Sequence, residues 1–84
     1  MLNSTKTAML AAIKKYMAEN GHNMQSIKSN NPFPCSTRWI SSLVESIKLN
    51  DKRNFNKTVC VEMMEFLGMN YGFDGGVLVC EKSN

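Results

Sequence analysis

Histidine is almost missing from this sequence, which has His22 alone among its 84 residues. A nucleophilic triad needs a base within reach of a serine or cysteine, and only His22 could serve. A metal site needs ligands at short, recognisable spacings, and His22 shows none with Cys35, Cys60 or Cys80. We therefore expect that the chain is not an enzyme and that it holds neither a metal nor another cofactor.

Long apolar runs are also missing. No run approaches the length of about 18 residues that a membrane span needs, so we expect no contact with a membrane. The N-terminal segment 1–7 is polar and is not followed by the apolar core of a secretory signal. Three widely spaced cysteines, an odd number, favour reduced thiols, and the expected location is therefore cytoplasmic.

What the sequence does contain is enough apolar material for one small core. Hydrophobic residues make up 43% of the chain, which argues against disorder throughout and predicts one compact domain over residues 1–84. The net charge of +3 is unevenly distributed. Residues 1–57 hold nine basic and three acidic residues, a net +6, whereas residues 58–84 hold one basic and four acidic residues, a net −3. This split predicts an electropositive side and an acidic end.

The stretch from Ser36 to Asn50 has the clearest helical pattern. Ser36 is a suitable N-cap, and Pro32 and Pro34 require the helix to begin after them. Four apolar residues recur at the spacing of one helical face and should be largely buried: Ile40, Leu43, Val44 and Ile47. Ile13 and Met63 should join them in the core.

Two further helices are expected before this one. The first covers residues 4–20, with Ser4 or Thr5 as its cap and three lysines on its outer side: Lys6, Lys14 and Lys15. A short helix follows over Met24–Ser29, capped by Asn23, with Met24 and Ile27 pointing inward.

The C-terminal third is predicted to contain one helix and one β-hairpin. Asn56 can cap a helix over Lys57–Leu67, and Gly68 can end it. Two short strands, over residues 69–73 and 77–80, flank Asp74-Gly75-Gly76, and Asp-Gly is a strong hairpin signal. The predicted fold is therefore mostly α (α+β): three longer helices, one short helix and a C-terminal β-hairpin.

A short helix, a break and a longer helix that opens with Ser36-Thr37-Arg38-Trp39 resemble a helix-turn-helix. With residues 69–80 in place of a wing, the arrangement is similar to winged-helix proteins. The resemblance implies a small DNA-binding regulator whose second helix, 36–50, enters the major groove of double-stranded DNA. Thr37 and Arg38 would lie nearest the bases, and Lys6 would contact phosphate. The residues expected at the nucleic acid are Lys14, Lys15, Lys28, Thr37, Arg38, Ser41, Lys52 and Arg53.

A protein-binding module is the alternative function. A small domain without catalytic groups can act as an accessory protein or inhibitor by covering a surface of a larger partner, with exposed aromatic and methionine side chains as anchors. The candidates are Met64, Tyr71 and Phe73, while Trp39, Phe66 and Leu67 are better explained as core. The small size would suit an accessory protein of a virus or mobile element in the host cytoplasm. The sequence leaves homodimer formation open.

Overall fold

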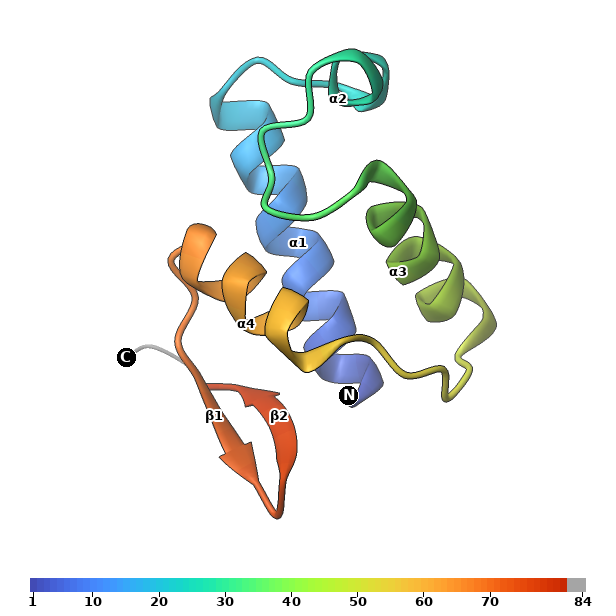
Figure 1. Ribbon diagram of the computed structural model, residues 1–84, viewed down its shortest axis with the longest axis vertical. Coiled ribbons are helices and arrows are strands. Elements are labelled where there is room, and N and C mark those ends of the chain that lie inside the picture. The colour runs from blue at the N-terminus through green and yellow to red at the C-terminus, as the bar shows by residue number, and fades with distance from the viewer. Residues whose placement is uncertain (82–84) are drawn as a thin grey trace.

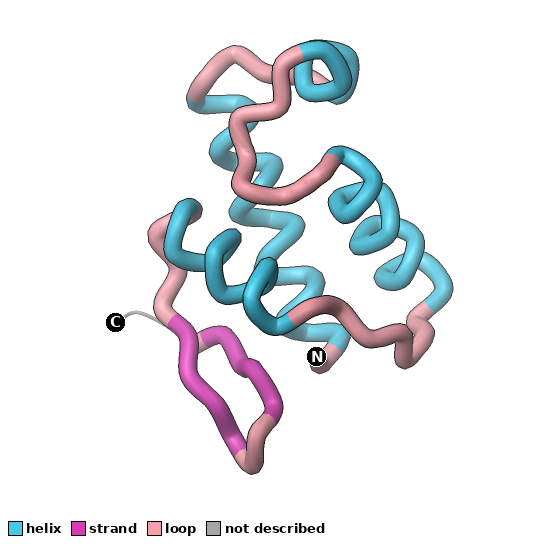
Figure 2. Tube along the Cα trace, viewed as in Figure 1, coloured by secondary structure: helices cyan, strands magenta, loops and turns pink. Residues whose placement is uncertain are grey.

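The computed structural model describes residues 1–81, which form four helices and one two-stranded antiparallel sheet (Figures 1 and 2). The elements, in chain order, are α1 (Asn3–Glu19), α2 (Met24–Ser29), α3 (Thr37–Leu49), α4 (Lys57–Phe66), β1 (Tyr71–Asp74) and β2 (Val77–Cys80). The predicted fold class is confirmed. Within the described residues, no helix combines the length and apolar character that crossing a membrane would need.

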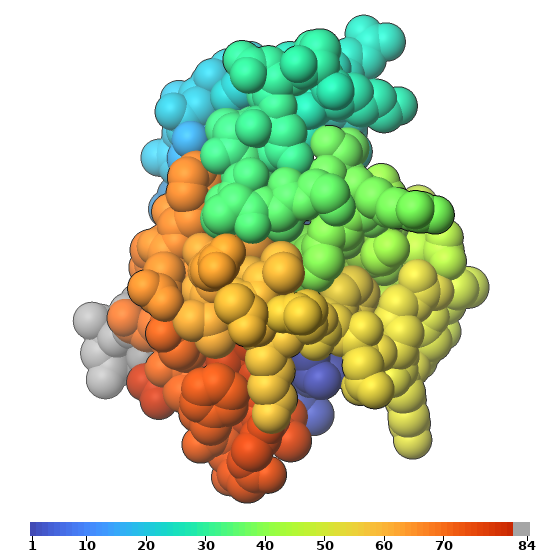
Figure 3. Space-filling model, viewed as in Figure 1, coloured from blue at the N-terminus to red at the C-terminus, as the bar shows by residue number. Residues whose placement is uncertain are grey.

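Helix α1 is the element on which the others pack. Helix α3 and strand β2 contact it directly, and Tyr16 from its C-terminal half meets the ring of Phe66 from α4 at 5.1 Å between centroids. The hairpin and α2 lie at opposite ends of the molecule (Figure 1). Figure 3 shows that residues 50–57 cover the surface between α3 and the hairpin.

The core draws residues from every helix and from β2. Its buried apolar side chains are Met9, Ile13, Ile27, Phe33, Ile40, Leu43, Cys60, Met63, Met64 and Leu78. The burial predicted for Ile13, Ile40, Leu43 and Met63 is confirmed. Val44 and Ile47 are only half-buried, because the buried line of α3 runs through Ile40, Leu43 and Ser46 instead.

Helix starts agree with the prediction where a side chain caps them. Asn23, Ser36 and Asn56 each accept a hydrogen bond from the backbone N–H three residues on, as expected for N-caps. Helix α1 differs, because Leu2 occupies its N-cap position without a side-chain hydrogen bond. The prediction of Ser4 or Thr5 as the cap is wrong, and Thr5 is buried within the helix.

The hairpin turn is one residue shorter than predicted, and β1 begins at Tyr71 where residue 69 was expected. Asp74 is the last residue of β1 and pairs with Val77, so Gly75 and Gly76 form a two-residue loop. Their φ values are +58° and +83°. This loop type needs positive φ at both central positions, which glycine adopts without a steric penalty.

Two side chains expected in the interior lie at the surface. Phe66 is 40% exposed, although one side of its ring packs on Tyr16 and Phe33. Met24 is 45% exposed, because α2 has only six residues and turns Ile27 alone into the core.

Candidate nucleic-acid interface

The outer stripe of α3 is the face expected to meet DNA. Four exposed residues form it: Arg38, Ser41, Glu45 and Lys48. They lie on the side opposite Ile40, Leu43 and Ser46, which fix the helix against α1. The stripe therefore has a defined orientation, with a cation near each end of the helix.

The N-terminal turn of α3 is held by the loop that precedes it. Asn31 donates from Nδ2 to the Cys35 carbonyl at 2.7 Å and accepts the Phe33 N–H at 2.8 Å. Phe33 is buried in the core and pins this loop. Ser36 Oγ then accepts the N–H of Trp39 at 3.1 Å. Arg38 thus projects from a backbone whose position is set on both sides.

Thr37 has a different environment from Arg38. It is half-buried, and its Oγ1 lies 3.5 Å from Nδ2 of Asn31. This contact directs Thr37 toward the loop. Of the two residues expected nearest the bases, Arg38 is thus the more exposed.

A shallow hollow lies between α2 and the outer stripe of α3. It is lined by Met24, Val44, Ser41, Glu45 and Lys48. Sequence reasoning missed Met24 as part of this surface, because the apolar pattern of a six-residue helix does not distinguish an inward from an outward methionine. Met24 gives the edge of the stripe an apolar border.

The cations expected at the nucleic acid fall into separate groups. Lys28 and Arg38 are exposed on α2 and at the start of α3. Lys14 and Lys15 are exposed on α1, where Lys15 borders a hollow shared with Glu19, Asn70 and Glu81. Lys52 lies beyond the far end of α3, roughly 16 Å along the helix from Arg38, beside Asn3 and Val77. The structure therefore divides them among α1, the neighbourhood of α2 and the start of α3, and the loop after α3.

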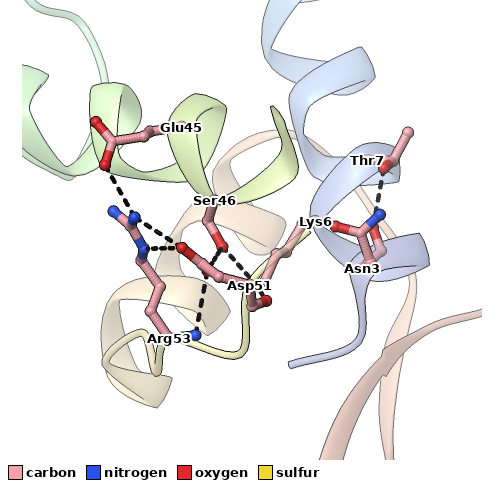
Figure 4. Close-up of polar contacts among 7 residues, drawn as sticks. All are labelled: Asn3, Lys6, Thr7, Glu45, Ser46, Asp51 and Arg53. Atoms are coloured by element: carbon pink, nitrogen blue, oxygen red, sulfur yellow. Dashed lines mark hydrogen bonds and ion pairs between the residues drawn. The ribbon is translucent and has the colours of Figure 1, made fainter. Parts of the chain in front are cut away.

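Two other cations that were expected to contact phosphate, Lys6 and Arg53, form hydrogen bonds or ion pairs within the protein. Lys6 is only 1% exposed, so the prediction that it lies on the outer side and contacts phosphate is wrong. Its Nζ donates to Ser46 Oγ at 2.6 Å and to the Asp51 carbonyl at 3.1 Å (Figure 4). It also lies 5.5 Å from the centroid of the Phe55 ring. A buried ammonium needs such partners, because desolvation of an unpaired charge is costly.

Arg53 is the second engaged cation. Its guanidinium approaches Asp51 Oδ2 at 2.7 Å and Glu45 Oε1 at 2.9 Å. Figure 4 shows these residues around one point where α1, α3 and the 50–55 loop meet. We call Lys6, Glu45, Ser46, Asp51 and Arg53 the Asp51 cluster. Arg53 therefore forms ion pairs within the protein, and its contact with phosphate stays a prediction.

Asp51 is the centre of this cluster. Its Oδ1 accepts from Ser46 Oγ at 2.6 Å, and its Oδ2 accepts from Arg53 Nε at 2.9 Å. These hydrogen bonds, that from Arg53 first, lower the pKa of the Asp51 carboxyl from 3.8 to about 2. Hydrogen bonds to Asp51 and then to Glu45 raise the pKa of Arg53 above its already high ordinary value. Asp51 and Arg53 are thus both ionised throughout the neutral range.

The residues expected at a protein partner also differ among themselves. Met64 is fully buried with no exposed surface, so it cannot anchor a partner, and that expectation is wrong. Tyr71 is half-buried and donates from its hydroxyl to Glu65 at 3.2 Å. Burial, and then the nearby Glu65 carboxylate, raise the pKa of Tyr71. Phe73 is 54% exposed, with Lys57 Nζ 5.8 Å from its ring centroid.

The thiols and the histidine occupy structural positions. Cys35, Cys60 and Cys80 are free thiols, as expected, and burial raises the pKa of Cys35 to about 11. His22 is half-buried beside the Tyr16 ring, with Nδ1 3.3 Å from Ser26 Oγ. Within residues 1–81, no three His, Cys, Asp or Glu side chains are grouped as a metal site.

Comparison with known proteins gives no family assignment. No protein-family model matches the chain, and neither a curated protein nor a solved structure matches it.

Proposed function

We propose that this chain binds double-stranded DNA through α3. One observation carries the proposal: Arg38 is exposed on a firmly held helix start, and no carboxylate of residues 1–81 forms an ion pair with it. An arginine in this position can donate two parallel hydrogen bonds to O6 and N7 of a guanine in the major groove. Ser41, one turn further along the same stripe, can donate to or accept from a neighbouring base.

The other exposed cations supply the contacts that carry no sequence information. Lys28 on α2 and Lys48 at the end of the stripe can approach phosphates on either side of the groove. Glu45 lies between them, and its pairing with Arg53 offsets the repulsion it would exert on a phosphate. The hairpin lies away from the start of α3 (Figure 1), so this mode of binding uses the helix without a wing.

The test compares Arg38 with a basic residue that lies outside the stripe. Wild-type protein should enrich a preferred duplex from a random pool, and its binding should weaken steeply with salt as counterions are released. Arg38→Ala should cost roughly 1 to 3 kcal/mol on the preferred duplex and relax the preference. Lys14→Ala is the matched control, since it removes one charge of the same sign and should leave the preference unchanged. Equal weak binding to every duplex by wild-type and Arg38→Ala would contradict the proposal.

One observation favours a protein partner as the second candidate. Phe73 is the most exposed aromatic side chain of the described chain and lies on the hairpin, away from α3. An accessory protein or inhibitor could anchor this ring in a pocket of its partner. In that case Phe73→Ala should abolish co-purification of one stoichiometric partner while the melting temperature stays within a few degrees, and Arg38→Ala should have no effect.

A further inference from the structure

Strand β1 has an unpaired edge whose backbone hydrogen-bonding pattern can be deduced. Asn70 O accepts the N–H of Glu81 at 3.0 Å, so residues 70 and 81 form a hydrogen-bonded pair. Pairs of this kind alternate along an antiparallel ladder. Gly72–Val79 and Asp74–Val77 are then hydrogen-bonded pairs, whereas Tyr71–Cys80 and Phe73–Leu78 are not. The backbone groups of Tyr71 and Phe73 therefore point away from β2.

Nothing in the described chain covers this edge. Strand β2 lies on the side of α1, and β1 is the outer strand (Figure 1). Within residues 1–81, no hydrogen bond reaches the backbone N–H or C=O of Tyr71 or Phe73. An exposed edge of this kind is a template for another strand.

When two copies of β1 run antiparallel to each other, the side chains that lie opposite one another are complementary. We propose that two copies of this chain pair through β1, antiparallel and about a twofold axis at Gly72. Tyr71 of each copy then lies opposite Phe73 of the other, and the outward backbone groups of both residues form four hydrogen bonds. Aromatic cross-strand pairs are favourable in sheets. Asp74 faces Asn70 of the other copy on the opposite face, so no like charges are directly paired.

Gly72 suits the position on the axis. Opposite residues of a pair without hydrogen bonds approach to about 4.5 Å between Cα atoms, and glycine brings no side chain into that space. The side chain of Glu81 lies over Gly72, since a Cβ at residue 72 would come within 2.5 Å of Glu81 Oε1. Two Glu81 carboxylates would thus flank the axis, and the repulsion between them would lower the stability of the dimer. With four residues in each strand, the contact is smaller than a standard interface of roughly 1,200–2,000 Å², so we expect a dimer in equilibrium with monomer.

The first test is the mass of the wild-type protein without DNA. Sedimentation over a concentration series should show a reversible shift from monomer to dimer. Phe73→Lys should displace this shift to higher concentration, because it removes one aromatic of each pair and adds charge at the edge. Val77→Lys is the matched control, since Val77 is exposed on the other strand and should leave the equilibrium unchanged. Wild-type protein that stays monomeric at every concentration would overturn the proposal, as would assembly beyond a dimer.

The second test reports the register and does not depend on Phe73. In the proposed pairing, residue 74 lies opposite residue 70 of the other copy at a Cα distance of about 4.5 Å, within the range of a disulfide. The double variant Asn70→Cys, Asp74→Cys should therefore give a covalent dimer when diamide oxidises the two thiols. Within one chain these positions are roughly 13 Å apart and cannot be bridged.

The single variants Asn70→Cys and Asp74→Cys are the controls, since each places its new thiol roughly 13 Å from its copy across the axis. They carry the same native cysteines and so the same background. Equal cross-linking of single and double variants, or no cross-linking of a double variant with wild-type circular dichroism, would refute this register. The dimer is measured without nucleic acid, so its failure is separate from a failure of DNA binding.

Discussion

At the scale of single residues, the Asp51 cluster shows how one carboxylate joins three segments. Asp51 accepts from Ser46 of α3 and Arg53 of its own loop, and its carbonyl accepts from Lys6 of α1. Removing the Asp51 carboxylate would take away the negative charge 4.0 Å from the buried Lys6 ammonium and the acceptor of the Ser46 hydroxyl, which costs more than the surface pairs alone contribute. We therefore expect Asp51 to influence stability through its protonation.

The pKa of Asp51 in the folded protein, about 2, lies below its ordinary value of 3.8. The folded state thus binds this proton less readily than the unfolded state. Its stabilising contribution is present above about pH 4 and is lost as the pH falls toward 2. We expect the free energy of unfolding of the wild type to fall over this range more steeply than that of Asp51→Asn, measured by urea denaturation.

Glu62→Gln provides the control for this pH series. Glu62 is exposed on α4, and no hydrogen bond within residues 1–81 reaches its carboxylate. Its variant should follow the wild-type pH dependence. Parallel curves for wild type and Asp51→Asn between pH 4 and pH 2 would show that Asp51 has no such role.

The two arginines show what a sequence leaves undetermined at this scale. Arg38 and Arg53 both lie in the basic part of the chain and were both expected to contact DNA. Arg53 is neutralised by Glu45, eight residues earlier, because the αL conformation of Asn50 turns the chain back along α3. Lys6 is an extreme case, since its partner Ser46 is 40 residues away. No local pattern reports such a contact.

At the scale of elements, helix starts were predictable where a side chain provides the cap. Asn23, Ser36 and Asn56 are followed by apolar periodicity, and each caps the expected helix. The start of α1 was not predictable from capping, because Leu2 offers no side-chain acceptor. Burial of its first turn by tertiary contacts, through Thr5 and Lys6, replaces the missing cap.

Apolar periodicity correctly predicted which side of α3 faces the core, but it predicted too wide a buried face. Leu43 lies at the centre of the buried face, whereas Val44 lies at its border beside Met24. We expect Leu43→Ala to lower the free energy of unfolding by roughly 2 to 5 kcal/mol, because the cavity would open in the centre of the core. Val44→Ala should cost about 1 kcal/mol or less. Chemical denaturation measures both, and equal costs would contradict the observed orientation of α3.

At the scale of the whole molecule, the hairpin shares the core of the helices. Leu78 from β2 is buried in the same cluster as Ile13 of α1 and Met63 of α4. Helix content followed by circular dichroism and the backbone amides of the hairpin followed by NMR should therefore change in one cooperative transition. Separate melting of hairpin and helices would show as transitions that do not coincide.

Leu78→Ala tests this coupling directly. The truncation should lower the single melting temperature of the whole protein by roughly 8 to 20 °C, since roughly 2 kcal/mol or more is lost from a small domain. Val77→Ala is the matched control, because Val77 is exposed on the adjacent position of the same strand. A helix transition that Leu78→Ala leaves unshifted would mean that the sheet does not support the helices.

The burial of Lys6 makes this side chain a built-in reporter of opening. The other lysines of residues 1–81 are exposed and can react with an acylating reagent at any moment, whereas the Lys6 amine can do so only after α1 separates from the 50–55 loop. The rate at which Lys6 is labelled, read by mass spectrometry of peptides, would thus give the frequency of that separation. An amine hidden in this way is also closed to any acyltransferase until the chain opens, so acylation at Lys6 would mark molecules that had lost their native packing.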